Sequence, residues 1–310
     1  MILAYIKNIF KKLIPNQWKS KIISRIEQRK QSNYLTQLKS KIIRFYDSKE
    51  NMTSEEEEVI AYLVSNPISV FPYDFQDKYN KSGIEVLEDI SNGLHYVLHD
   101  NKKLYFKRSY SVAKIKSLYH GLLLDQDPNS PHLYLTKDFS LNSKDVIADI
   151  GAAEGNFSLS NIETVKKIYL FECDSEWIEA LEATFKPWKD KVVICNKFVS
   201  NIDNKDSITL DTFVKEYDDI TFLKVDIEGE EANFLEGAHS FLQSIKQFKM
   251  AICTYHKQED QAEFTRLLKT YNLEVQPSNR FMIFYHDHTI NAPYLRRGLL
   301  RAQTKTIKNE

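Results

Sequence analysis

The chain has 310 residues, of which 42% are hydrophobic and 27% charged, with a formal net charge of −1. This length suffices for one ample domain plus an extension. No apolar run reaches the roughly eighteen residues of a membrane-spanning helix, so the composition excludes a transmembrane span. The three cysteines, Cys173, Cys195 and Cys253, show no paired spacing, which argues against disulfides or a zinc motif and is typical of a cytoplasmic protein.

The charge is distributed unevenly. Residues 1–45 hold eleven Lys or Arg against Glu27 alone, a net charge of +10, so the remainder carries about −11. An acidic body repels a phosphate backbone, and we therefore expect no nucleic-acid partner. Residues 1–50 are predicted to form a basic helical segment.

The first fifteen residues place apolar side chains at helical spacing opposite lysines, and Pro15 ends the pattern. Such a helix can lie peripherally on an anionic membrane, here at the inner membrane face, or pack on the body or on a partner subunit. The pattern favours the second interpretation and leaves the oligomeric state open.

Residues 51–140 are predicted to form an α+β accessory or acceptor-binding region. Helices are expected at Gln17–Phe45, Ser54–Ser65 and Ser111–Leu124, and a three-stranded meander at Ile84–Lys107. The turn-rich stretch 125–135 follows, placed to cover a ligand as a lid. Its candidate acceptor-binding residues are Gln126, Asp127, Ser130, His132 and Tyr134.

A glycine loop at 145–155, DVIADIGAAEG, joins an apolar strand to an amphipathic helix. Glycines in such a turn allow close backbone approach, to a ligand at Gly151 and between helix and strand at Gly155. Asp149 and Glu154 would repel a pyrophosphate, whereas they suit the cationic S-adenosylmethionine (SAM). The predicted cofactor contacts in this loop are Asp149, Gly151, Ala152 and Gly155.

A second strand, Ile168–Glu172, ends in a carboxylate about twenty residues after the first glycine. This spacing favours Glu172 as a ligand of the ribose hydroxyls, with Cys173 beside it in the cofactor site. A structural turn and a solvated strand end are the alternatives, but the two motifs in this order favour binding.

The strand at 220–225 leads into Asp226, Glu228, Glu230 and Glu231. Ligands of open α/β sheets bind beyond the carboxyl ends of the strands, so Asp226 and Glu228 are expected to face the same crevice as the glycine loop. Glu230 and Glu231 are interpreted as residues that favour a helix start.

The remaining elements are expected as a helix at 231–242, a buried strand at 248–255, a helix at 258–271 and a hairpin of 273–276 with 281–285. Residues 291–310 are interpreted as a basic tail. The strand at 248–255 places Tyr255 and His256 beside Asp226, where Tyr255 could contact an acceptor and His256 could take a proton.

These motifs together resemble the FkbM family of SAM-dependent methyltransferases. The resemblance rests on Asp149-x-Gly151, FECD with Glu172, SITLDTF at 207–213 and LKVDIEGEE at 223–231. It implies an α/β class I methyltransferase fold over residues 141–290, a Rossmann-like seven-stranded sheet with one antiparallel strand and helices on both faces, and O-methylation. Cys173 in place of proline, and Ala153-Glu154 in place of Asn-Ile, depart from the family pattern.

A sugar hydroxyl needs a base as its proton becomes acidic during methyl transfer. We expect His256 or Asp226 to take that proton and Glu228 to orient the acceptor. Asp226, Glu228 and His256 could instead hold a divalent metal.

The 71–75 and 125–135 segments look like family members found among bacterial surface-polysaccharide gene products. The sequence therefore predicts a cytoplasmic SAM-dependent O-methyltransferase acting on a carbohydrate, either a surface polysaccharide or a nucleotide- or lipid-linked sugar. A natural product or another lipid-linked acceptor is the enzymatic alternative. A scaffold without turnover, either nucleotide-binding or membrane-associated, is the alternative from another class.

Overall fold

The computed structural model describes residues 16–217, 220–244 and 247–305, so the amphipathic pattern of residues 1–15 lies outside the described residues. The chain divides into two compact units between Pro72 and Tyr73. This boundary falls inside the predicted 51–140 region, whose later part shares a unit with the core. No helix among the described residues is both long enough and apolar enough to cross a bilayer.

The first unit contains two helices, α2 (Asn16–Asp47) and α3 (Ser54–Ser65), as the sequence predicts. The start of α3 is fixed by Thr53, whose side chain accepts a hydrogen bond from Glu56 while the Glu56 side chain accepts one from Thr53. Thr53 rather than Ser54 therefore opens this helix.

The second unit begins with the 3-10 turns η1 (Asp74–Lys78) and η2 (Lys81–Gly83). The expected meander follows as β1 (Leu87–Asp89), β2 (Leu94–His99) and β3 (Lys102–Tyr105). Helix α4 (Val112–Asp125) then leads to the main sheet, and the Ser111 side chain caps its first turn.

The main sheet has seven strands in the order β11-β12-β10-β9-β4-β5-β6. Their bounds are β4 (Val146–Ile150), β5 (Lys167–Phe171), β6 (Val192–Cys195), β9 (Phe222–Val225), β10 (Lys249–Cys253), β11 (Leu273–Pro277) and β12 (Leu299–Thr304). Strand β12 runs antiparallel to both of its neighbours, and the pairs among β10, β9, β4, β5 and β6 are parallel. This is the class I methyltransferase order, with one antiparallel strand as expected.

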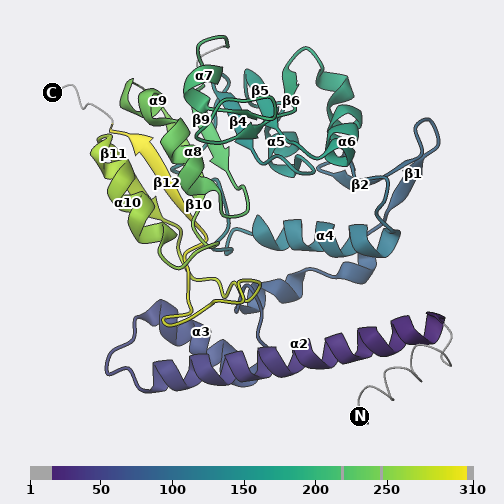
Figure 1. Cartoon of the computed structure of the whole chain (residues 1–310), viewed down its shortest axis with the longest axis vertical. Coiled ribbons are helices and arrows are strands. Elements are labelled where there is room, and N and C mark those ends of the chain that lie inside the picture. The colour runs from purple at the N-terminus through teal and green to yellow at the C-terminus, as the bar shows by residue number, and fades with distance from the viewer. Residues whose placement is uncertain (1–15, 218–219, 245–246, 306–310) are drawn as a thin grey trace, which may run out of the picture. The chain divides into compact units, whose positions relative to one another are not determined.

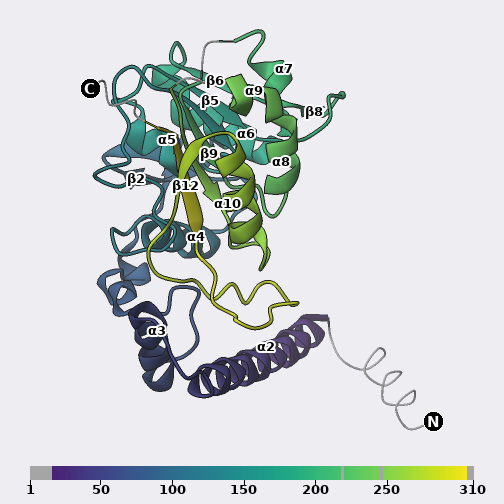
Figure 2. The same ribbon diagram turned by 90° about the vertical axis from the view of Figure 1, so that its left-hand side faces the viewer.

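Helices cover both faces of the sheet (Figures 1 and 2). One face packs on α7 (Leu210–Phe213), α8 (Glu231–Gly237), α9 (His239–Ser244) and α10 (Asp260–Thr270). On the other side lie α5 (Asn156–Asn161), whose Phe157 ring stacks on Phe222, and α6 (Ser175–Phe185), which is followed by η3 (Lys186–Trp188). A separate parallel pair, β7 (Phe198–Val199) and β8 (Ser207–Ile208), leads into α7.

The end of the chain differs from the sequence prediction. The expected strand at 281–285 is wrong, because Met282 makes only an isolated bridge with Arg296. The partner of β11 is β12, inside the segment expected to be a basic tail. A hydrophobicity pattern does not indicate this strand, because it contains the charged Arg301. The Arg301 guanidinium donates to the Tyr134 and Leu133 carbonyls instead of facing water.

A buried ion pair joins the central strands. Asp149 on β4 is paired in register with Lys224 on β9, and Lys224 Nζ lies 3.0 Å from Asp149 Oδ1. The same ammonium donates to the Gly151 carbonyl at 2.6 Å, and Ser158 donates to Asp149 Oδ2 at 2.7 Å. Both charged side chains are almost fully buried, so removing either one would leave the other as an unpaired charge in the interior.

Replacing Lys224 alone should therefore be far costlier than replacing both partners. Lys224→Met leaves a buried carboxylate without its cation, and should lower the free energy of unfolding by about 3–5 kcal/mol in urea denaturation. The double variant with Asp149→Asn should recover more than half of that loss. A double variant as unstable as the sum of the two single variants would contradict the coupling.

Candidate functional site

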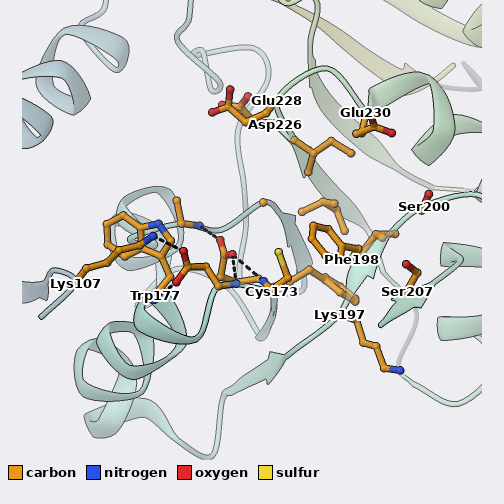
Figure 3. A pocket seen from close by; sticks show the side chains of 18 residues that line it. Lys107, Cys173, Trp177, Lys197, Phe198, Ser200, Ser207, Asp226, Glu228 and Glu230 are labelled. Atoms are coloured by element: carbon orange, nitrogen blue, oxygen red, sulfur yellow. Dashed lines mark hydrogen bonds and ion pairs between the residues drawn. The ribbon is translucent and has the colours of Figure 1, made fainter. Parts of the chain in front are cut away.

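A cavity of about 550 Å³ opens at the carboxyl ends of β4, β5 and β9. The predicted cofactor residues Gly151, Glu172, Cys173 and Asp226 line it, together with Glu228. Figure 3 shows Asp226 and Glu228 on one side of this cofactor cavity, with Cys173 and Trp177 on the opposite side. The structure thus brings together the ends of strands that the sequence places far apart.

The Glu172 carboxylate also orders the loops around the cofactor cavity. Its Oε2 accepts the Ala153 N–H at 3.0 Å, and its Oε1 accepts the N–H groups of Cys173 and Asp174 at 2.7 and 2.9 Å. Oε2 accepts only one of these N–H groups, so its second lone pair can still accept a hydrogen bond from a hydroxyl group.

Trp177 and Lys107 are cavity residues that sequence reasoning missed. Lys107 Nζ lies 4.9 Å from the Trp177 ring centroid and 2.5 Å from Asp174 Oδ2. Trp177 sits on α6 and Lys107 just after β3, so no local motif could have joined them. An indole lining this cavity offers an aromatic face to a nucleobase.

Both glycines of the loop lie where a side chain would meet neighbouring protein atoms. A Cβ on Gly151, which has φ +78°, would lie 2.0 Å from the Asp226 carbonyl oxygen, and one on Gly155, with φ +79°, would lie 2.7 Å from Leu181. These glycines permit close approach of protein to protein. Asp149, Ala152 and Gly155 are absent from the lining of the cofactor cavity among the described residues.

The charges that favour a cationic ligand also come from other residues than the sequence predicts. Asp149 is neutralised by Lys224, and Glu154 is buried beneath the loop. Burial raises the pKa of Glu154 to about 7. The negative charges that line the cofactor cavity are instead those of Glu172, Asp174, Asp226, Glu228 and Glu230.

Asp226 is the most connected side chain of the site. Tyr134 donates to its Oδ2 at 2.9 Å and Tyr255 to its Oδ1 at 3.2 Å, while His132 Nε2 lies 3.6 Å from Oδ2. Burial alone would raise the pKa of Asp226, but nearby positive charge, including that of Lys224, and the Tyr134 hydroxyl hold it below its ordinary value. Asp226 is therefore a carboxylate at neutral pH.

His256 lies between three carboxylates. Its Nδ1 is 3.1 Å from Glu231 Oε1, and its Nε2 is 3.8 Å from both Asp226 Oδ1 and Glu228 Oε2. Burial lowers the pKa of His256, but the adjacent Glu231 carboxylate, together with Asp226 and Glu228, outweighs it and raises the pKa above its ordinary value. Glu231, expected only as a helix opener, is fully buried behind this ring.

The Glu231 position is set by backbone groups. Its Oε1 accepts the Ile227 N–H at 3.0 Å and the Gly229 N–H at 3.4 Å, in the turn between β9 and α8. Glu228 in the same turn has φ +57° and an exposed side chain. The E-G-x-E spacing thus points one carboxylate inward and leaves the other in solvent.

The predicted acceptor residues of the 125–135 segment are mostly internal. Asp127 accepts from Tyr79 at 2.8 Å and from Lys78 at 3.3 Å, Gln126 bonds the backbone of His132 and Tyr134, and Ser130 accepts the His132 N–H. Burial lowers the pKa of His132 to about 4, so its ring is uncharged at neutral pH. None of the five lines the cofactor cavity.

Two groups of described residues bring possible metal ligands together. Asp226, Glu231 and His256 form one, and His132, Asp226 and Cys253 form the other, with ligand atoms within 4.8 Å of one another. The predicted set contained Glu228 rather than Glu231. The metal stays a prediction.

Sheet order and cavity position together define a class I methyltransferase domain. Residues 170–288 match the family model of the methyltransferase FkbM domain. The resemblance deduced from the motifs is thereby confirmed for these residues. No curated protein matches the chain.

Solved structures with a similar fold include the FkbM methyltransferase of Methylobacillus flagellatus KT, with 17% identity and a TM-score of 0.42, covering 62% of this chain and 54% of that one. An rRNA methylase from Streptococcus thermophilus has 16% identity and a TM-score of 0.37, covering 53% of this chain and 89% of that one. A putative methyltransferase from Streptococcus mutans, solved in complex with S-adenosylhomocysteine (SAH), has 15% identity and a TM-score of 0.37, covering 61% of this chain and 97% of that one. The chain spans about half the length of the first of these proteins.

Glu172 should contribute to the binding of the cofactor, whereas Glu230, which lines the same cavity, should not. Glu172 orders the Ala153 and Asp174 backbone around the cavity and keeps one lone pair of Oε2 for a hydroxyl group, whereas Glu230 is an exposed residue that accepts from the Asn233 side chain. Glu172→Ala should weaken SAM binding at least about tenfold in equilibrium dialysis, as expected for a lost hydrogen bond to a charged group. Glu230→Ala is the matched control and should stay within about twofold. Equal effects of the two substitutions would remove Glu172 from the cofactor site.

Glu154 should make stability fall as pH rises. Its pKa is raised from 4.5 to about 7 on folding, so between these values the folded state binds more protons than the unfolded state. Glu154→Gln removes this proton uptake, so the free energy of unfolding of the variant should rise by roughly 1–3 kcal/mol relative to the wild type between pH 5 and pH 8 in urea denaturation. A difference independent of pH would refute the raised pKa.

Proposed function

We propose that the protein is a SAM-dependent O-methyltransferase that methylates a carbohydrate hydroxyl with His256 as general base. The observation that carries this proposal is the position of His256, which contacts the buried Glu231 and lies 3.8 Å from Asp226 and Glu228, two of the carboxylates that line the cofactor cavity. A base held at the edge of such a cavity is what a weakly acidic hydroxyl requires.

The cofactor cavity suits SAM in its donor set. Glu172 offers carboxylate oxygens to ribose hydroxyls, Trp177 offers an aromatic face, and Asp226 offers negative charge opposite them. Bound there, SAM would supply an activated methyl group. The protein then needs chiefly to hold the acceptor oxygen in line and to accept its proton.

His256 is better suited than Asp226 to accept this proton. Asp226 already accepts hydrogen bonds from Tyr134 and Tyr255, and its lowered pKa makes it a weak base. The raised pKa of His256 makes its ring a stronger base. The proton arriving on Nε2 would give an imidazolium whose Nδ1 faces Glu231, in the manner of a carboxylate-oriented histidine. Glu228, exposed beside Nε2, is placed to orient the acceptor.

The carbohydrate acceptor and the cytoplasmic location are part of this proposal. They are supported by the resemblance to polysaccharide-associated family members and by the three cysteines, all of which are free. Transfer of a radiolabelled methyl group from SAM to fractionated cell glycans tests the acceptor. Label in lipid or small-molecule fractions alone would favour a natural product or lipid-linked acceptor, and no label in any fraction would favour a scaffold.

Substitutions at His256 and Glu231 should separate base from positioning residue. His256→Ala should lower kcat at least about tenfold at pH 8 while leaving SAH affinity within about twofold. Glu231→Gln should lower kcat less and move the acid limb of the pH–rate profile to lower pH, because Glu231 raises the pKa of His256 and the reaction needs the ring deprotonated.

The matched control is Glu230→Gln, one residue away and outside this contact, which should leave the profile unchanged. Wild-type kcat in His256→Ala would contradict the base assignment. An unmoved profile in Glu231→Gln would reduce Glu231 to a structural role.

A further inference from the structure

A second cavity, of about 560 Å³, adjoins the cofactor cavity. Glu228 lines both cavities, Asp226 lines only the first and His256 only the second. The predicted base therefore lines this second space, while its Nε2 lies 3.8 Å from two carboxylates of the cofactor cavity. Its far wall comes from the loop between β11 and β12, which sequence reasoning took for a hairpin and a tail.

We propose that this second cavity binds the acceptor as an uncharged sugar, seated against Phe284. The proposal rests on the proposed function and deepens it by assigning the acceptor site and its chemical class.

Hydrogen bonds within the protein hold the wall of the second cavity in place. Arg296, 3% exposed, donates to the Tyr255 and His256 carbonyls at 2.8 Å and pairs with Asp287. Asp287 in turn accepts from the Thr289 hydroxyl at 2.6 Å. These bonds tie the 284–291 loop to the strand end that carries His256.

The charges of the wall disfavour an anionic acceptor. Both lining cations are engaged within the protein, Arg296 as described and Lys257 through its bond to the Gly229 carbonyl at 2.6 Å. Burial lowers the pKa of His286, so its ring is uncharged at neutral pH. Glu228 and Glu259 remain as exposed carboxylates, which accept hydroxyl protons and repel phosphate or uronate groups.

The remaining lining combines an aromatic face with neutral hydrogen-bonding groups. The half-buried Phe284 ring lies 5.6 Å from the His256 ring and 4.8 Å from that of Tyr255. Gln258 and Asn291 add side-chain amides. An aromatic face beside carboxylates and amides matches the mixed apolar and hydroxyl surface of a neutral sugar.

Saturation-transfer NMR on the full chain with SAH tests this assignment. The probes are methyl glycosides of glucose, galactose, mannose and N-acetylglucosamine, with methyl glucuronide and glucose 6-phosphate as charged counterparts. At least one neutral glycoside should bind, and the charged counterparts should bind more weakly. Phe284→Ala should weaken the neutral probe at least about fivefold.

Two further variants keep the test independent of misfolding. Glu259→Lys, an exposed substitution, should strengthen methyl glucuronide binding by about twofold to fivefold. Leu267→Ala, on an exposed site of α10 outside this cavity, should change nothing.

The assignment is overturned if no neutral probe binds, if the charged probes bind equally well, or if Phe284→Ala behaves as wild type. Calorimetric titration of SAH into the same samples separates the two levels of the proposal. Loss of SAH binding in the wild type would remove the proposed function itself, whereas intact SAH binding with failed probes would remove only the acceptor site.

Discussion

The site depends on the meeting of β4 and β9 at their carboxyl ends. Lys224 neutralises Asp149 and bonds the Gly151 carbonyl, while the absence of a side chain on Gly151 lets the loop lie against the Asp226 backbone. A charge left unpaired in this interior would be costly, so the pair ties the two strand ends to one geometry. The loop and Asp226 are thereby held at the same cavity.

The carboxylates that follow β9 have three different environments. Asp226 is held by two tyrosine hydroxyls, Glu231 is buried against His256, and Glu228 is left in solvent by a left-handed backbone. Environment rather than residue type distinguishes them, because burial and neighbouring charge set which protonation state each group favours. Three carboxylates of one short acidic run therefore differ in burial and in hydrogen-bond partners.

The motif-bearing parts of the fold could be predicted from sequence, and the interior polar contacts could not. The strand, loop and helix around Gly151, and the strand ending at Glu172, follow local patterns that survive in the structure. Strand β12 was missed because Arg301 is satisfied by carbonyls of the distant 133–134 segment. Glu231 was missed because an acidic residue at a helix start has a sufficient local explanation.

The most direct measurement of the central claim is a calorimetric titration of the full chain with SAM, SAH and NAD in parallel. We predict micromolar binding of both sulfur ligands and no binding of NAD, because the cofactor cavity is lined by carboxylates that repel a pyrophosphate. Preference for NAD, or silence with both sulfur ligands, would contradict the methyltransferase function.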